Sequence, residues 1–470
     1  MNGRGKIKFT RIAAFFSLLL FTLILIYVTE SRAVRSISFA ISTLPADPSD
    51  EEMYQAQQPD EDSENVTSII LAADKKYDID AGFIEFCIND ENINTDGQLL
   101  SNIIYYIGSS GYRDDMWGEL TGLSFSVLYD IYTGAASADG SGDPSITVFG
   151  DLYESSTTTI SFAGDVNLSY DWYLLEYFRT HYSAVEDCFS SDLLDLMRGS
   201  DIFIVNNEFS ISTRGTALSG KLYTFRADPD DIHFLTDIGV DLVTLANNHV
   251  YDYGEDAFFD TISHLEDAGI ITVGAGESID EASEVKYVIS GGMKIAFCAA
   301  SSAETSRYTP VADEETAGVM GIYDTAAFLA EIEEAAANSD YVVVLAHFGT
   351  ENSSVINDTQ RAAAEAMIDA GADIVVGAHP HVLQPIEYYN GGLIAYSLGN
   401  FWFNMNTVDT GVLTVSVDVN LRTTYKFTPC IQSAGAVKTA EGDEKTRILE
   451  WMNSVSETAV IGENLKISEK

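Results

Sequence analysis

The chain has 470 residues, of which 46% are hydrophobic and 11% aromatic, so it can build a sizeable core and about two or three folded units. Its 72 acidic residues against 25 basic ones give a formal net charge of −47. Such a surface has no basic stripe to release counterions from a nucleic acid backbone, and we exclude DNA and RNA as partners.

The first predicted element is a membrane segment at residues 12–28, with the sequence IAAFFSLLLFTLILIYV and no charged side chain. At 1.5 Å per residue it just spans a hydrocarbon core of about 30 Å when flanking residues help. The residues before it include four basic ones, Arg4, Lys6, Lys8 and Arg11. Because positive flanks stay in the cytoplasm, we expect residues 1–35 to form a cytoplasmic tail and a single-pass anchor, with the main domain extracytoplasmic. The alternative is a cleaved signal peptide, with a poor cleavage site at residues 31–33.

Three segments of different composition follow the anchor. Residues 36–65 are rich in acids, Pro, Gln and Ser, which predicts a self-repelling linker. Residues 66–133 carry apolar side chains near helical spacing and predict a small, mostly helical unit. The Gly/Ser/Ala/Asp-rich sequence that follows predicts a second linker at 134–157.

The four cysteines are far apart and include no CxxC pair, which argues against a zinc ribbon or a redox motif. Cys298 lies in an apolar run and is expected to be a buried thiol. The even count leaves disulfides open.

From residue 146 onward, short apolar strands alternate with helices, which predicts an α/β domain over residues 158–470. The expected strands cover residues 159–163, 202–205, 242–245, 270–273, 342–345, 374–376 and 393–396. The expected helices cover residues 231–238, 258–265 and 360–370.

Polar side chains follow nearly every one of these strands, where α/β sheets bind their ligands. The fragments are Gly164-Asp165-Val166-Asn167, Asn206-Asn207-Glu208, Asn247-Asn248-His249, His347 and His379-Pro380-His381. Four of the seven histidines are therefore at strand ends. Together the fragments predict one shared site.

Each fragment alone has an ordinary structural explanation. A Gly-Asp after a strand is usually a turn with a capping carboxylate, and a lone His347 is usually a hydrogen-bonded histidine. His379 and His381 would face opposite ways in an extended chain unless Pro380 bends it. Carboxylate, amide and imidazole groups without a thiolate suit Mn, Fe or Zn ions, and two such ions need a bridging carboxylate, for which Glu208 is the candidate.

Five sequence blocks resemble the poly-gamma-glutamate capsule synthesis (CapA) family, a branch of the calcineurin-like metallophosphoesterases. They are FAGDVNLS at 162–169, NNEFSI at 206–211, LANNHVYDYG at 245–254, AHFGTE at 346–351 and GADIVVGAHPHVLQPIEYYNGGLIAYSLGNFWF at 371–403. The resemblance implies a metallophosphoesterase-like α/β/β/α sandwich, preceded by the transmembrane helix and the small helical unit.

The same resemblance implies roles for individual residues. Asp165, Glu208 and His381 would hold one metal ion. Glu208, Asn248, His347 and His379 would hold the other, and His249 beside Asn248 would act as general acid. Asn167 replaces the histidine of the first phosphoesterase motif and would be a weaker ligand, while Glu208 replaces an aspartate.

The segment between Glu208 and Asp228 carries only basic charges, on Arg214, Lys221 and Arg226. One hypothesis is that these side chains bind an anionic substrate, and the alternative is a solvated loop.

Two functions are therefore expected from the resemblance. The first is a metal-dependent, phosphoesterase-like hydrolase or transferase for the synthesis, export or attachment of poly-gamma-glutamate or another anionic envelope polymer. The alternative is a non-catalytic capsule assembly factor that binds the polymer or a membrane synthase complex.

Overall fold

The computed structural model describes residues 70, 81–95, 97–113, 115–137, 142–150, 152, 157–170, 173–304, 307–322 and 325–470. The chain divides into two compact units between Thr121 and Gly122. The predicted anchor at 12–28 and linker at 36–65 lie outside the described residues. Among the residues that are described, no helix has both the length and the apolar character needed to cross a membrane.

The first unit is helical, as its apolar spacing predicts. Its described helices are α3 (Ala81–Asn89), α4 (Leu99–Ser110) and α5 (Met116–Thr121). Leu99, Ile103 and Ile107 recur every four residues on α4 and are all buried. Phe83 packs edge-on against Trp117 with ring centroids 5.6 Å apart.

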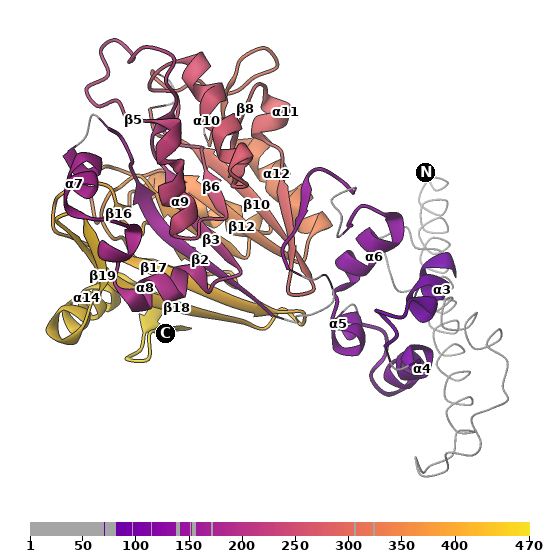
Figure 1. The fold of residues 1–470 in the computed structure, drawn as a ribbon. Helices are drawn as coiled ribbons and strands as arrows, with labels where there is room; N and C mark the ends of the chain where they lie inside the picture. Colours follow the sequence, from indigo (N-terminus) through magenta and orange to yellow (C-terminus); the bar gives the residue numbers. More distant parts are fainter. Residues whose placement is uncertain are drawn as a thin grey trace, which may run out of the picture. The chain divides into compact units, whose positions relative to one another are not determined.

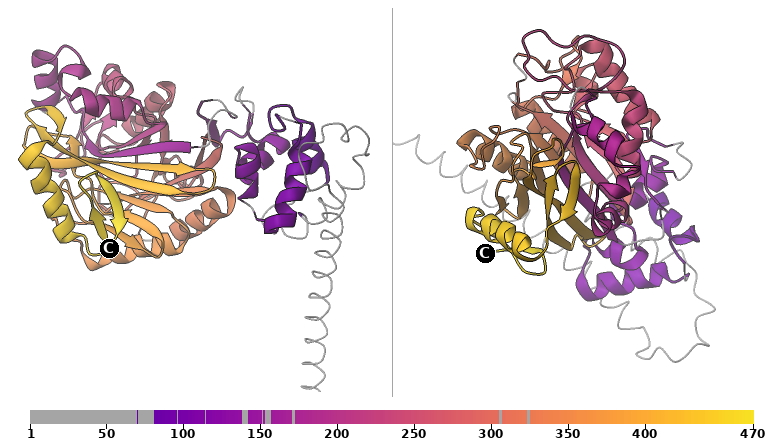
Figure 2. Two further views of the ribbon diagram at one scale, coloured as in Figure 1. Left: turned by 90° about the horizontal axis from the view of Figure 1, so that it is seen from below. Right: turned by 60° about the vertical axis from the view of Figure 1, so that its left-hand side comes forward.

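The second unit is a sandwich of two large mixed sheets with helices on its outer faces (Figures 1 and 2). The first sheet has the order β1-β9-β10-β12-β13-β15-β14, with strands β1 (Ile146–Val148), β9 (Lys286–Ser290), β10 (Met293–Ser301), β12 (Tyr341–His347), β13 (Ile374–Ala378), β14 (Ile386–Tyr389) and β15 (Gly392–Ala395). The second sheet has the order β20-β21-β18-β17-β2-β3-β6-β7, and β16 pairs with β2 and β19 with β18. Its strands are β2 (Thr157–Val166), β3 (Ile202–Asn207), β6 (Leu242–Thr244), β7 (Ile271–Val273), β16 (Asn400–Trp402), β17 (Val408–Asp418), β18 (Thr423–Ser433), β19 (Ala436–Thr439), β20 (Ala459–Ile461) and β21 (Lys466–Glu469).

Helices and short strands complete the second unit. The helices are α6 (Phe125–Thr133), α7 (Tyr173–His181), η1 (Val185–Asp187), α8 (Ser191–Arg198), η2 (Pro229–Ile232), α9 (His233–Asp237), α10 (Glu255–Asp267), α11 (Ile279–Ala282), α12 (Thr325–Asn338), α13 (Asp358–Asp369) and α14 (Gly442–Val455). Two small ribbons pair β4 (Ser210–Ile211) with β5 (Arg226–Ala227) and β8 (Ala275–Gly276) with β11 (Gly318–Val319).

Each sheet contains four neighbouring parallel strands, and their common direction decides where the strand ends meet. β10, β12, β13 and β15 run parallel in one sheet, and β2, β3, β6 and β7 do so in the other. Because parallel strands end at one edge, the polar residues after β2, β3, β12 and β13 are brought together. The two sheets face each other across one apolar core that includes Phe162, Ile204, Phe297, Val343 and Leu413.

The boundary between the units differs from the expected one. α6, expected in the first unit, belongs to the second, where Asp130 forms an ion pair with Lys294 of β10 at 2.8 Å. The expected linker at 134–157 contains β1, which pairs in parallel with β9. The α/β domain therefore includes residues that composition alone assigned to a helical unit and a linker.

Candidate metal centre

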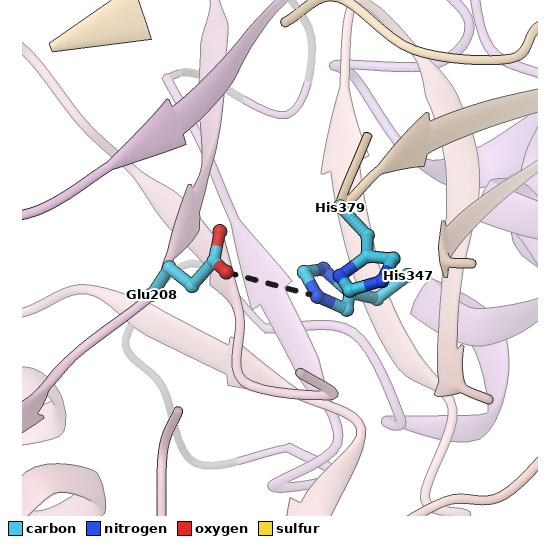
Figure 3. A group of neighbouring side chains, drawn as sticks. All are labelled: Glu208, His347 and His379. Atoms are coloured by element: carbon cyan, nitrogen blue, oxygen red, sulfur yellow. Dashed lines mark ion pairs between the residues drawn. The ribbon is translucent and has the colours of Figure 1, made fainter. Parts of the chain in front are cut away.

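The strand-end residues singled out by the sequence meet in one buried site. Glu208 directly follows β3, and its side chain points toward the rings of His347 and His379 (Figure 3). The ring centroids of His347 and His379 are 4.8 Å apart, and those of His379 and His381 are 6.1 Å apart.

The His379-Pro380-His381 segment leaves the extended conformation immediately after β13. His379 has a φ of 97° and His381 a φ of 59°, both in a region that non-glycine residues seldom adopt. This bend turns both imidazoles into the same site, which alternation along a strand would have prevented.

Two groups of candidate ligands share one carboxylate. The first is Glu208, His347 and His379, and the second is Asp165, Glu208 and His381. In each group the ligand atoms lie within 4.8 Å of one another. The second group is one of the two sets that the family resemblance implied, and the first is the other set without Asn248.

The shared Glu208 carboxylate has one oxygen that is suited to a cation. Its Oε1 lies 3.9 Å from Nε2 of His249, 3.9 Å from Nε2 of His347 and 3.8 Å from Nε2 of His381. This oxygen and the Nδ1 of His379 are buried, and neither has a hydrogen-bond partner among the described residues. Buried polar atoms normally find partners, so these two atoms fit a bound divalent ion.

Asparagine side chains hold the two carboxylates in place. The Asn206 amide donates to Oδ1 of Asp165 at 2.8 Å and to Oε2 of Glu208 at 3.1 Å. The Asn247 amide in turn donates to Asn206 Oδ1 at 3.1 Å. Asn248, the fourth residue assigned to the second metal, places its Oδ1 2.8 Å from Nε2 of His347.

His249 belongs to a buried chain of polar groups. Its Nδ1 is 2.7 Å from Oδ2 of Asp252, and Oδ1 of Asp252 is 2.7 Å from the ammonium of Lys221. The same Asp252 Oδ2 accepts the backbone N–H of Phe225 at 2.7 Å. Since its Nδ1 is engaged, His249 presents only Nε2 to the site.

Burial and the neighbouring charges set the protonation of the ligands. Burial raises the pKa of Glu208 well above its usual value, and the adjacent Asp165 adds to this effect. Burial lowers the pKa of His347 well below its usual value and that of His379 to about 3. At His381 burial is outweighed by Glu208 and by the hydrogen bond to Asp165, which raise its pKa to about 10. For His249, burial lowers the pKa against the opposing effect of Asp252.

The remaining predicted site residues have other partners. Asn167 is buried, and its side-chain oxygen accepts the backbone N–H of Ser169 at 2.8 Å. Arg214 forms ion pairs with Asp256 and Asp260 on an exposed face. The Arg226 guanidinium lies 4.0 Å from the centroid of the Tyr253 ring. The hypothesis that Arg214, Lys221 and Arg226 bind an anionic substrate stays a prediction.

Several orienting residues were not assigned to the site from the sequence. Asn206 and Asn247 lie inside the strand-end fragments and Asp252 inside the block at 245–254, but nothing in the sequence shows that they contact the carboxylates and His249. Asn400 lies far along the chain and still places its Oδ1 2.9 Å from Nδ1 of His381. The sequence marked Asn400 only by its position in the block at 371–403, within YSLGNF at 396–401.

Comparison with known proteins gives a clear family match. A family model described as "Bacterial capsule synthesis protein PGA_cap" matches residues 159–405. The PGA biosynthesis protein CapA of Bacillus subtilis (strain 168) is 34% identical over 239 residues, which cover 50% of this chain and 62% of that protein. The capsule biosynthesis protein CapA of Bacillus anthracis is 36% identical over 188 residues, covering 39% of this chain and 45% of that protein. The match therefore spans less than two thirds of either relative.

Among solved structures, a putative 5′-nucleotidase from Staphylococcus aureus in complex with alpha-ketoglutarate resembles this chain with 14% sequence identity and a TM-score of 0.37. The likeness covers 63% of this chain and 59% of that one. A TM-score of 0.37 is too low for any argument about this chain.

Proposed function

Because the chain belongs to the bacterial capsule synthesis protein family PGA_cap, we propose that it serves the synthesis, export or attachment of poly-gamma-glutamate or a similar anionic envelope polymer. We further propose that it does so through a metal-dependent hydrolase or transferase site built on Asp165, Glu208, His347, His379 and His381.

The main support for this proposal is the unpaired, histidine-lined surroundings of the Oε1 atom of Glu208. Three imidazole Nε2 atoms surround it at 3.8–3.9 Å, and it accepts no hydrogen bond from any described residue. A purely structural carboxylate this deeply buried would be expected to have its oxygens paired. A carboxylate bridging two divalent ions needs such an oxygen free, and the two ligand groups share only Glu208.

The chain's own residues would then have separate roles. Divalent ions bound here would polarise a phosphoryl oxygen of the substrate and lower the pKa of a bound water. Asn206 and Asn247 hold the two carboxylates side by side despite their repulsion. His249, whose Nδ1 contacts Asp252, would donate a proton from Nε2 to the leaving group as general acid.

The test is metal analysis of the purified full chain together with hydrolysis of an aryl phosphate ester. We expect bound Mn, Fe or Zn and a metal-dependent turnover that chelation abolishes. Glu208→Gln keeps the shape of the side chain but removes the bridging charge, so it should lower both metal content and turnover. A metal-free wild type without chelator-sensitive hydrolysis would contradict the catalytic proposal.

One observation favours the alternative, a non-catalytic assembly factor that binds the polymer or a membrane synthase complex. Asn167, at the position of the first-motif histidine, offers no imidazole to a metal ion, and its oxygen accepts the backbone N–H of Ser169. If Glu208→Gln cells make normal amounts of polymer while cells lacking the protein do not, the assembly role is the better description.

We also propose that the α/β unit works outside the cytoplasm and is held by residues 12–28. The charge asymmetry around that segment supports this placement. Protease treatment of intact cells should remove the domain, and complete protection would contradict the placement.

A further inference from the structure

Asn400, at the start of β16, contacts a histidine of the candidate metal centre. It is buried, and its Oδ1 lies 2.9 Å from Nδ1 of His381. The same Nδ1 lies 2.9 Å from Oδ2 of Asp165. One ring nitrogen of His381 therefore faces two oxygen atoms.

A close approach of two backbones places Asn400 there. A Cβ added at Gly164 would lie 1.7 Å from the carbonyl oxygen of Gly399, so only glycine fits at this position. The backbone N–H of Asp165 donates to that same carbonyl at 3.0 Å. As a result, β16 pairs with β2 in the register that sets Asn400 beside Asp165.

The other nitrogen of the His381 ring faces the shared carboxylate. Its Nε2 lies 3.8 Å from Oε1 of Glu208. A histidine that binds a metal through one nitrogen commonly donates the N–H of the other to an oxygen, which fixes its tautomer and its orientation. Asn400 and Asp165 both offer such an oxygen to Nδ1.

We propose that Asn400 is a positioning residue that accepts the Nδ1–H of His381 and so keeps Nε2 directed at the cation beside Glu208. With Asn400 accepting this hydrogen bond, the Asp165 carboxylate stays available as a ligand. The oxygen of Asn167 instead accepts the backbone N–H of Ser169. The inference rests on the proposed metal site and adds to it a residue outside both ligand groups.

The experiment is a Mn²⁺ titration of the purified full chain by calorimetry, with three variants. Asn400→Leu has nearly the same volume but no acceptor, and it should weaken Mn²⁺ binding about 10- to 100-fold, as loss of an outer-shell partner typically does. Asn400→Asp keeps an acceptor and should bind within a few-fold of the wild type. Asn406→Leu, at an exposed position of the same segment, is the control and should bind like the wild type.

A crystal structure of the Mn²⁺-loaded wild type completes the test and does not depend on how the variants fold. We expect Nε2 of His381 on the metal and Oδ1 of Asn400 hydrogen-bonded to Nδ1. An Asn400 oxygen in the coordination sphere, or His381 bound through Nδ1, would overturn the inference.

The outcomes separate this inference from the proposed function. If the wild type binds Mn²⁺ and folded Asn400→Leu binds equally well, the positioning role is wrong while the metal site stands. If the wild type binds none of the candidate divalent ions, the proposed metal site itself fails, and the role of Asn400 falls with it.

Discussion

At the scale of single residues, the candidate metal centre combines ionisable side chains, Glu208 and three histidines, with asparagine side chains that contact them. The sequence could predict four of these side chains, namely Glu208, His347, His379 and His381. Ionisable residues concentrated at strand ends are an uncommon pattern. Asn206 and Asn400 could not be predicted in this way, because an asparagine fits a turn, a cap or a loop equally well, and only tertiary contacts show what its amide holds.

The first residue-scale prediction separates proton transfer from metal binding. His249→Ala should lower turnover about 10²- to 10⁴-fold, because a general acid or base contributes about that much. Its metal content should stay near that of the wild type, since His249 is in neither ligand group. His381→Ala should lower metal content as well as turnover. Parallel metal analysis and initial rates decide, and a loss of metal from His249→Ala would contradict its assignment.

The second concerns Lys221, whose side chain is 4% exposed and lies against the fully buried Asp252. Lys221→Met should lower the free energy of unfolding by about 3–5 kcal/mol, because it leaves Asp252 charged and buried without its counter-ion. Arg214→Met is the comparison on the same loop: the Arg214 side chain is 53% exposed in its ion pairs with Asp256 and Asp260, so the loss of stability should be smaller. Urea denaturation measures both, and similar effects of the two variants would show that Lys221 does not anchor Asp252.

At the scale of elements, most of the parallel strands were predicted from their apolar runs, while β10 and the long antiparallel strands were not. β2, β3, β6, β12 and β13 each overlap an expected strand within a few residues. The long antiparallel strands β17 and β18 have mixed burial and carry polar residues, so no single period marked them. They pair with each other, and β17 joins them to β2, which lies far earlier in the sequence.

The starts of four parallel strands, at the sheet edge opposite the site, share one structural feature. Asp201, Asp241, Asp340 and Asp373 each precede a parallel strand, and each carboxylate accepts a backbone N–H at the start of the neighbouring strand. The four contacts set strand register at the edge away from the candidate metal centre.

The contribution of Asp373 to the stability of the fold depends on pH. Burial raises its pKa to about 6, against the hydrogen bond from Val342. Between about pH 4 and pH 6 the folded protein keeps a proton that the unfolded chain, with a pKa of about 3.9, has released, so this group's contribution to stability falls as pH rises. Asp373→Asn keeps an acceptor and removes the charge, so it should raise the free energy of unfolding by up to about 3 kcal/mol at pH 7.5 and by little at pH 4.

Denaturant titrations of wild type and Asp373→Asn across that range measure the difference. Asp241→Asn should change stability in the same direction and by a similar amount, because burial raises the pKa of Asp241 to about 6 as well. Equal pH slopes for wild type and Asp373→Asn would contradict this account.

At the scale of the whole molecule, composition predicted two folded parts but placed their boundary too late in the chain. Val127 and Leu128 of α6 look like any apolar helix residues, and the Gly-rich stretch after them looks like a linker. What ties them to the α/β unit is a set of polar contacts that composition does not show. Ser124 and Ser126 donate to Asp340 at 2.5 and 2.6 Å, beside the Asp130–Lys294 pair.

The last prediction compares two fragments that begin on either side of these contacts. A fragment of residues 122–470 keeps α6, β1 and the partner of Lys294, and it should fold with the metal affinity of the full chain. A fragment of residues 158–470 loses α6 and with it the ion pair of Asp130 with Lys294, whose side chain is 9% exposed in the full chain. It also uncovers the edge of β9 by removing β1, which favours aggregation. Thermal unfolding and size-exclusion chromatography should show the shorter fragment to be less stable and prone to associate. Equal stability of the two would mean that residues 134–157 act as the linker that their composition suggests.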